Sequence, residues 1–173
     1  KPVPCIQLLH CIENEVSGGY STLVDGFTVA NHIKKKFNKY FDILTSTKVR
    51  FRFVDKNIIL ENWGELIELD QNKNLKQVRY NTKIEYVPHL DKKSLELFYN
   101  ARKKMGELCC SNELQIKFKL MPGDLLMMDN HRTLHGRTAY DPREGMRHLQ
   151  GGYIDFDSSE GKLRHLERKF DFK

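Results

Sequence analysis

The chain contains 173 residues, of which 39% are hydrophobic and 10% aromatic, a composition typical of one folded domain and not of a disordered tail. No apolar run is long enough to cross a membrane, so we expect no membrane partner. The net charge is +6, but lysines alternate with acidic residues and no platform of interleaved basic and aromatic residues occurs, so we expect no nucleic-acid partner. Four cysteines without a CxxC pair favour a reducing compartment, and we expect the cytoplasm.

The first part of the chain predicts two strands and a helix. Residues 5–12 are largely apolar and read as a buried strand. The paired glycines Gly18-Gly19 predict a turn, because glycine accepts positive φ, and residues 21–26 then form the returning strand. From residue 27 to about 40 apolar residues recur at helical spacing, a stripe that can continue through 41–45.

The middle of the chain predicts short strands followed by a helix. Val49, Phe51 and Phe53 alternate with charged residues, the period of a half-buried strand. Further strand candidates are residues 57–62, 65–69 and 75–80. Asp91 is a suitable N-cap for a helix whose apolar stripe runs to about residue 109.

The last third predicts more strands and a closing helix. Residues 114–120 alternate as an amphipathic strand, and Pro122-Gly123-Asp124 predicts a turn. Strands are then expected at residues 125–128, 133–136 and 147–155, and a basic helix at 158–170. Many short strands with two helical insertions indicate a mainly β fold, an antiparallel barrel or jelly roll.

The densest group of chemically active side chains runs from Asp129 to Arg137. Within it, His135 precedes a glycine that would leave room for a ligand, and neutral imidazole binds iron or zinc. Arg147 follows His135 by twelve residues and offers a planar fork for a carboxylate. These two features are compatible with a metal site, although a single histidine before glycine is common in proteins without one.

Several motifs in the chain resemble those of one enzyme family. In chain order they are Leu8-Leu9-His10-Cys11, Gly18-Gly19-Tyr20-Ser21, Leu23-Val24-Asp25-Gly26-Phe27, Val78-Arg79-Tyr80-Asn81, Pro122-Gly123-Asp124, Asp129-Asn130-x-Arg-x-Leu-His-Gly-Arg137 and Arg147-His148-Leu149-x-Gly-x-Tyr153. Together they resemble the γ-butyrobetaine and trimethyllysine hydroxylases of the taurine dioxygenase-like group, over nearly the whole chain. The resemblance implies a double-stranded β-helix (jelly roll), Fe(II), 2-oxoglutarate, O₂ and hydroxylation of an unactivated C–H bond, with ascorbate as an optional addition.

The resemblance also implies roles for five residues. His135 matches the distal histidine of the iron site, and Arg147 the arginine that pairs with the far carboxylate of 2-oxoglutarate. Ser21 occupies a hydroxyl position that can bind the same cosubstrate. Tyr153 matches a tyrosine of the cage that holds a trimethylammonium group, and Asn81 falls in the segment that helps to hold the substrate carboxylate.

The resemblance leaves the substrate open. A small zwitterion such as γ-butyrobetaine or trimethyllysine, as in carnitine biosynthesis, is the first expectation. An aminophosphonate or taurine-like substrate is the alternative, and a non-catalytic cupin-like binding domain is a second one. His131 stands where the eukaryotic hydroxylases carry tryptophan, and Thr82-Lys83 is poorer in amides than the butyrobetaine pattern. A homodimer is an option by resemblance to similar enzymes.

The resemblance places the remaining iron ligands, a His-x-Asp pair, ahead of Lys1. We therefore expect residues 1–173 to be one partial oxygenase domain, incomplete at its N-terminus and inactive by itself. Two segments within the chain resemble this His-x-Asp motif in sequence. In His89-Leu90-Asp91 the aspartate is better explained as a helix cap, and in His165-Leu166-Glu167 the side chains diverge on a helix. His10 is expected to pack or hydrogen-bond near the cosubstrate.

Overall fold

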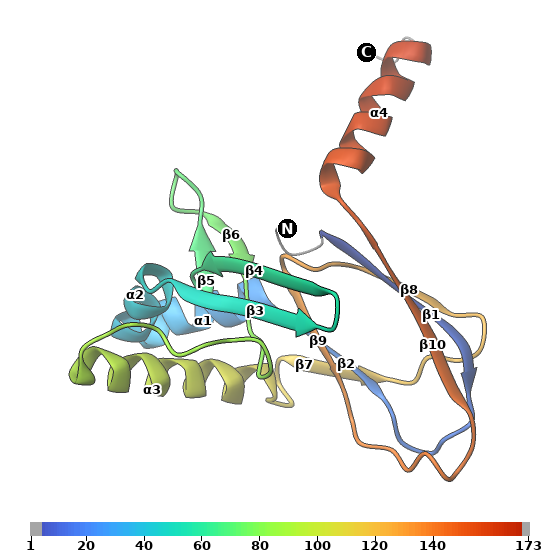
Figure 1. Ribbon diagram of the computed structural model, residues 1–173, viewed down its shortest axis with the longest axis horizontal. Helices are drawn as coiled ribbons and strands as arrows, with labels where there is room; N and C mark the ends of the chain where they lie inside the picture. Colours follow the sequence, from blue (N-terminus) through green and yellow to red (C-terminus); the bar gives the residue numbers. More distant parts are fainter. Residues whose placement is uncertain (1–4, 171–173) are drawn as a thin grey trace.

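The computed structural model describes residues 5–170. Figure 1 shows the elements, which confirm the predicted mainly β fold with helical insertions. The strands are β1 (Ile6–Asn14), β2 (Ser21–Asp25), β3 (Val49–Asp55), β4 (Ile58–Gly64), β5 (Ile67–Leu69), β6 (Leu75–Val78), β7 (Gln115–Phe118), β8 (Leu125–Asp129), β9 (Thr133–Arg137) and β10 (Arg147–Ile154). The helices are α1 (Gly26–Lys36), α2 (Asn38–Ser46), α3 (Lys92–Cys109) and α4 (Phe156–Phe170).

Two antiparallel three-stranded sheets form one half of the molecule (Figure 1). One has the strand order β10-β1-β8 and the other the order β7-β2-β9. The chain passes from one sheet to the other in four connections, at residues 15–20, 119–124, 130–132 and 138–146. Residues far apart in the sequence are therefore brought together at the ends of both sheets. The hairpins β3-β4 and β5-β6 complete the strands.

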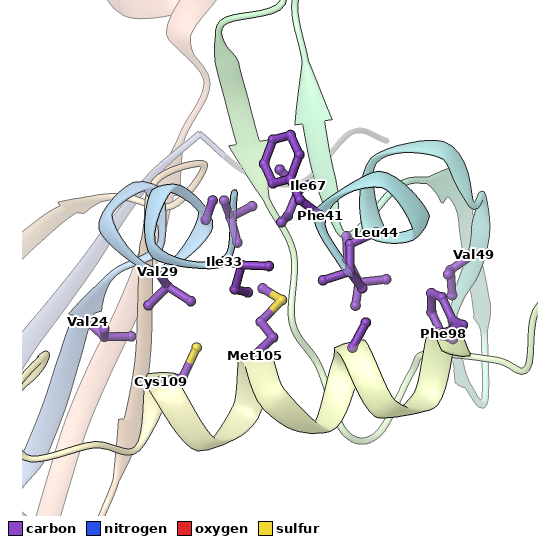
Figure 2. Packing of buried hydrophobic residues seen from close by; sticks show 14 residues of the cluster. Val24, Val29, Ile33, Phe41, Leu44, Val49, Ile67, Phe98, Met105 and Cys109 are labelled. Carbon is purple, nitrogen blue, oxygen red and sulfur yellow. The ribbon is translucent and has the colours of Figure 1, made fainter. Parts of the chain in front are cut away.

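The main hydrophobic core lies between helices α1, α2 and α3 (Figure 2). The buried stripe of α3 consists of Phe98, Ala101, Met105 and Cys109, spaced at helical intervals. Asp91 caps this helix. Its carboxylate accepts hydrogen bonds from the backbone N–H groups of Lys93 at 3.0 Å and Ser94 at 3.1 Å. The predicted helix and its cap are thus confirmed.

The predicted continuous helix from residue 27 onward is wrong. Phe37 leaves the helical conformation, with φ −139° and ψ 59°, and separates α1 from α2. Its ring stacks on Tyr40 with 5.8 Å between centroids. Both short helices contact α3, each with its own buried residues. The helical stripe of the sequence therefore does not show where the helix breaks.

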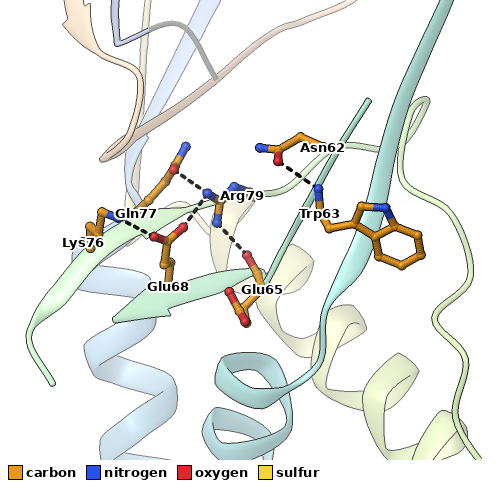
Figure 3. A network of polar contacts seen from close by, with 7 residues as sticks. All are labelled: Asn62, Trp63, Glu65, Glu68, Lys76, Gln77 and Arg79. Atoms are coloured by element: carbon orange, nitrogen blue, oxygen red, sulfur yellow. Dashed lines mark hydrogen bonds and ion pairs between the residues drawn. The ribbon is translucent and has the colours of Figure 1, made fainter. Parts of the chain in front are cut away.

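A largely buried arginine, Arg79, ties the β5-β6 hairpin to the end of β4 (Figure 3). Arg79 donates to the Gln77 side chain at 2.6 Å and to the backbone carbonyl of Glu65 at 3.0 Å, and it also pairs with Glu68. Next to it, the Val78 N–H donates to the His131 carbonyl at 2.9 Å. The hairpin is thus joined to the turn that leads into β9.

Helix α4 projects away from both halves of the molecule (Figure 1). None of its residues is buried. Its first residue, Phe156, meets the His131 ring edge to face with 5.3 Å between centroids. Among residues 5–170 no helix combines the length and the hydropathy that crossing a membrane requires.

Candidate active site

The β7-β2-β9 sheet presents two different faces. Val24 and Leu134 lie on the face that packs against the helical core. His135 pairs with Leu23, and Ser21 pairs with Arg137, so these four residues lie on the opposite face, because side chains alternate along each strand. We call this the His135 face. It brings two of the predicted site residues, His135 and Ser21, onto neighbouring strands.

The surroundings of His135 favour the protonation state that a metal ligand requires. Although part of its ring is exposed to solvent, the surrounding protein desolvates it and lowers its pKa below the ordinary value. This lowering favours the neutral imidazole, which has a nitrogen lone pair to offer. Ser21, two residues from the partner of His135, is 6% exposed.

In the other sheet, the edge strand β10 pairs with the central strand β1 and carries two more of the predicted residues. Arg147, Leu149, Gly151 and Tyr153 alternate along β10 and share one face, which we call the Arg147 face. Tyr153 pairs with the buried Gln7 and is itself 60% exposed. Its ring thus stands on the Arg147 face with room for a ligand.

Arg147 is held at the start of β10 without an acidic partner. Its Nη2 donates to the Gly19 carbonyl at 3.3 Å, and its guanidinium carbon lies 5.2 Å from the centroid of the Tyr140 ring. Its Nε is buried and has no hydrogen-bond acceptor among the described residues. Within residues 5–170 no carboxylate pairs with this guanidinium. A ligand carboxylate would supply the missing charge.

Asn81 lies in the loop after β6 and is used there by the protein itself. Its side-chain oxygen accepts hydrogen bonds from the backbone N–H groups of Lys83 at 2.8 Å and Ile84 at 3.1 Å. Its carbonyl accepts from Arg102 at 3.2 Å. Among the described residues no hydrogen bond or ring contact joins Asn81 to the other four predicted residues, so its role toward a substrate stays a prediction.

The expectation for His10 is wrong. His10 pairs with Gln150 and Leu125, which places it on the face of its sheet opposite to Arg147. It is exposed there, beside the exposed Leu125. His148, one residue from Arg147, lies on the same outer face as His10.

The described residues contain no complete metal site, and the role of His135 as a ligand stays a prediction. No group of three His, Cys, Asp or Glu side chains within residues 5–170 could hold a metal ion. Asp91 is occupied as the cap of α3, where the hydrogen bonds that it accepts from the Ser94 hydroxyl and backbone N–H hold its pKa below its usual range. Glu167 and His165 lie on the exposed helix α4. Neither of the two local pairs therefore competes with His135.

Two contributors to the site had no assigned role in the sequence. Tyr140, which contacts Arg147, lies in a loop without any periodic pattern. Gly19 was visible as a turn residue, but its contact with Arg147 depends on a strand that lies more than a hundred positions later. A long-range contact of this kind leaves no local signal.

Comparison with known families identifies the relatives of this chain. The family model described as "Taurine catabolism dioxygenase TauD, TfdA family" matches residues 1–153. Gamma-butyrobetaine dioxygenase of Homo sapiens is 35% identical over 173 residues, which is 97% of this chain and 45% of that protein. The Pseudomonas sp. (strain AK-1) protein of the same name is 30% identical, over 95% of this chain and 43% of that protein.

Trimethyllysine dioxygenase of Bos taurus is also similar, at 30% identity over 94% of this chain and 40% of that protein. The chain thus spans less than half the length of these curated relatives. Among solved structures, asparagine oxygenase in complex with Fe(II), 3-hydroxyasparagine and succinate superposes with a TM-score of 0.67 at 18% identity, covering 91% of this chain and 48% of that one. AAD-2 in complex with Mn(II) and N-oxalylglycine gives a TM-score of 0.65 at 14% identity, covering 87% and 63%. Such likeness shows a shared fold.

Proposed function

Because the chain belongs to the TauD/TfdA family of dioxygenases, we propose that it carries the distal iron ligand and the cosubstrate anchor of an Fe(II)- and 2-oxoglutarate-dependent dioxygenase. The substrate is a small betaine-like molecule such as γ-butyrobetaine or trimethyllysine, the compounds named in the similar proteins. The two three-stranded sheets are the corresponding part of a double-stranded β-helix, with the His135 face and the Arg147 face lining one site.

One observation carries this proposal: the Arg147 guanidinium has no carboxylate partner among residues 5–170, and the pair of sheets that carries it also carries the His135 imidazole. Arg147 binds the far carboxylate of 2-oxoglutarate through charge-assisted hydrogen bonds, and this carboxylate balances a charge that has no acidic partner in the described residues. Ser21 donates its hydroxyl to the same cosubstrate from the neighbouring sheet. Burial strengthens these contacts because solvent screens them less.

His135 is one of three protein ligands to Fe(II), and the other two come from outside the described residues. The pKa of His135, which burial lowers, favours the neutral imidazole, whose nitrogen lone pair binds the metal. When bound with 2-oxoglutarate, Fe(II) supplies the activation of O₂ that hydroxylation of a C–H bond requires. The protein's own part is to fix the cosubstrate and the substrate beside that centre.

Tyr153 provides an aromatic surface for the cationic end of the substrate. A quaternary ammonium group cannot donate a hydrogen bond, and aromatic faces hold such groups by cation–π attraction. The exposed ring of Tyr153 on the Arg147 face suits this role. Asn81 is the proposed contact for the substrate carboxylate, through the amide nitrogen that its own loop does not use.

The test is succinate release from 2-oxoglutarate by the protein expressed from its complete reading frame. We expect γ-butyrobetaine or trimethyllysine to stimulate release, and taurine and an aminophosphonate to do so less. His135→Leu should abolish stimulated release, whereas His10→Leu, a matched change of an outer-face histidine, should keep it. A preference for taurine or the aminophosphonate would replace the betaine assignment, and equal activity of both histidine variants would contradict the role of His135.

A further inference from the structure

The loop of residues 138–146, which joins β9 to β10, is fastened along the turn of residues 15–20. The Thr138 N–H donates to the Tyr20 carbonyl at 2.9 Å, and the Gly19 N–H donates to the Ala139 carbonyl at 3.1 Å. Farther along, Glu144 accepts from the Ser17 N–H at 2.7 Å. The loop is therefore fixed at several points, and the side chain of Tyr140 has a defined place beside both sheets.

The Tyr140 ring contacts two cations. The guanidinium carbon of Arg137 lies 4.5 Å from its centroid, and that of Arg147 lies 5.2 Å away. Both distances are within the range of a cation–π contact. Neither arginine forms an ion pair with a carboxylate of residues 5–170. Two positive charges thus lie beside the Tyr140 ring without a carboxylate partner from the described residues, and an anionic ligand could pair with them.

The two glycines of the 15–20 turn, Gly18 and Gly19, allow the 138–146 loop and Arg147 to approach so closely. A Cβ atom on Gly19 would lie 2.8 Å from the Arg147 Nε, and the backbone there has φ +69°, which favours glycine. A Cβ atom on Gly18 would lie 2.4 Å from the Ala139 carbonyl oxygen. Both positions need glycine because the loop and the guanidinium approach the turn too closely for a side chain. The turn and the Tyr140 ring together enclose the guanidinium.

We propose that Tyr140 is a positioning residue, which holds the Arg147 guanidinium in the orientation that binds the far carboxylate of 2-oxoglutarate. This proposal rests on the proposed function, since it gives Tyr140 no contact with the cosubstrate. An arginine side chain has many rotamers, and fixing it before the ligand arrives removes an entropic cost from binding. The aromatic face is the required feature, and the Tyr140 hydroxyl is not.

The experiment compares 2-oxoglutarate with 2-oxopentanoate, which has a methyl group in place of the far carboxylate. Binding is measured by calorimetry under nitrogen with Mn(II), on the protein from the complete reading frame. Tyr140→Leu should weaken the binding of 2-oxoglutarate by roughly 3- to 30-fold, which corresponds to the range of a cation–π contact. The same variant should keep its affinity for 2-oxopentanoate within about twofold of the unaltered protein. Tyr140→Phe should bind both 2-oxo acids with the affinity of the unaltered protein. Equal losses for both acids in Tyr140→Leu would mean a merely structural role and would overturn the proposal.

Arg147→Leu provides the reference that separates this proposal from the proposed function. If Arg147→Leu keeps its affinity for 2-oxoglutarate, the anchor role of Arg147 is wrong and the Tyr140 proposal fails with it. If Arg147→Leu loses that affinity while Tyr140→Leu keeps it, the Tyr140 proposal alone is wrong. In the double variant, Tyr140→Leu should add no further loss, because its effect passes through Arg147. If Tyr140→Leu does not fold, Tyr140→Met is measured in the same comparison with the same criteria.

Discussion

Asp25 and Arg132 form a two-pronged ion pair that joins the end of β2 to the turn preceding β9. The Arg132 Nε donates to one carboxylate oxygen at 3.0 Å and its Nη2 to the other at 2.8 Å. Asp25 also caps α1, accepting from the Phe27 N–H at 3.0 Å and from the Thr28 hydroxyl at 2.9 Å. One side chain therefore fixes both the helical core and the strand that carries His135.

Stability should depend on pH through Asp25. The hydrogen bond from Arg132, with those from Thr28 and Phe27, lowers the pKa of Asp25 to about 2 from the ordinary 3.8. Since the folded state binds this proton more weakly than the unfolded state, the contribution of Asp25 is fully present above about pH 5. It is lost as the pH falls toward 2. Urea unfolding of the unaltered protein and of Asp25→Asn between pH 7 and pH 2 should give curves that converge at the acidic end.

Asp25→Ala separates the cap from the charge. Asparagine is a good N-cap and alanine a poor one, so the alanine variant should lose about 1 kcal/mol through the cap alone. The asparagine variant should lose less, because a solvent-exposed pair is screened. Equal losses in the two variants at pH 7 would show that Asp25 does not act as a cap.

The loop that carries Asn81 depends on a buried ion pair. Arg102 of α3 binds both carboxylate oxygens of Glu85, one of them at 3.1 Å, and stacks on the Tyr80 ring at 4.8 Å. The Glu85 side chain is 6% exposed. Glu85→Ala leaves the arginine charge buried without its partner and should cost about 3–5 kcal/mol in the free energy of unfolding. The exposed Glu96 on the same helix provides the control, because Glu96→Ala should change stability by less than about 0.5 kcal/mol.

The strands and the long helix could be predicted because their patterns are local. Alternation identifies β7 and the helical stripe identifies α3, each to within a few residues. His10 was misplaced for a related reason. Residues 5–12 are apolar on both faces, so the run lacks alternation, and pairing with β8 and β10 decides which face looks outward. The helical stripe likewise does not show the break at Phe37.

The candidate site could be predicted from the sequence only through the motifs that it shares with the family. His135, Arg147, Ser21 and Tyr153 stand at positions that the family resemblance specifies, and pairing distributes them over two sheets. Tyr140 follows no such rule. Its place depends on the hydrogen bonds between the 138–146 loop and a turn about 120 residues earlier, a relationship of tertiary structure that no window of sequence contains.

Arg147 should control the affinity for 2-oxoglutarate. A charged partner that is buried with its ligand is typically worth about 2–5 kcal/mol, so Arg147→Leu should raise the KM for 2-oxoglutarate at least about 30-fold. Arg143→Leu is the matched control, because Arg143 is exposed and pairs with Asp141 in its own loop. Steady-state succinate assays measure both. An unchanged KM in Arg147→Leu, or an equal rise in Arg143→Leu, would contradict the assignment.

Tyr153 should recognise the charge of the substrate and not its shape. The quaternary ammonium of γ-butyrobetaine is attracted to the electron-rich face of the ring, whereas a neutral analogue with a tert-butyl group has nearly the same size without the charge. Tyr153→Leu should weaken the binding of the betaine by about 0.5–2 kcal/mol and leave the binding of the neutral analogue almost unchanged. Tyr153→Phe keeps the aromatic face and should keep the discrimination. Because Tyr153 is 60% exposed, its replacement should leave the thermal unfolding of the protein close to that of the unaltered chain. Competition between the betaine and the neutral analogue in each variant measures the difference directly, and equal losses for both ligands in Tyr153→Leu would mean that the ring contributes contact area alone.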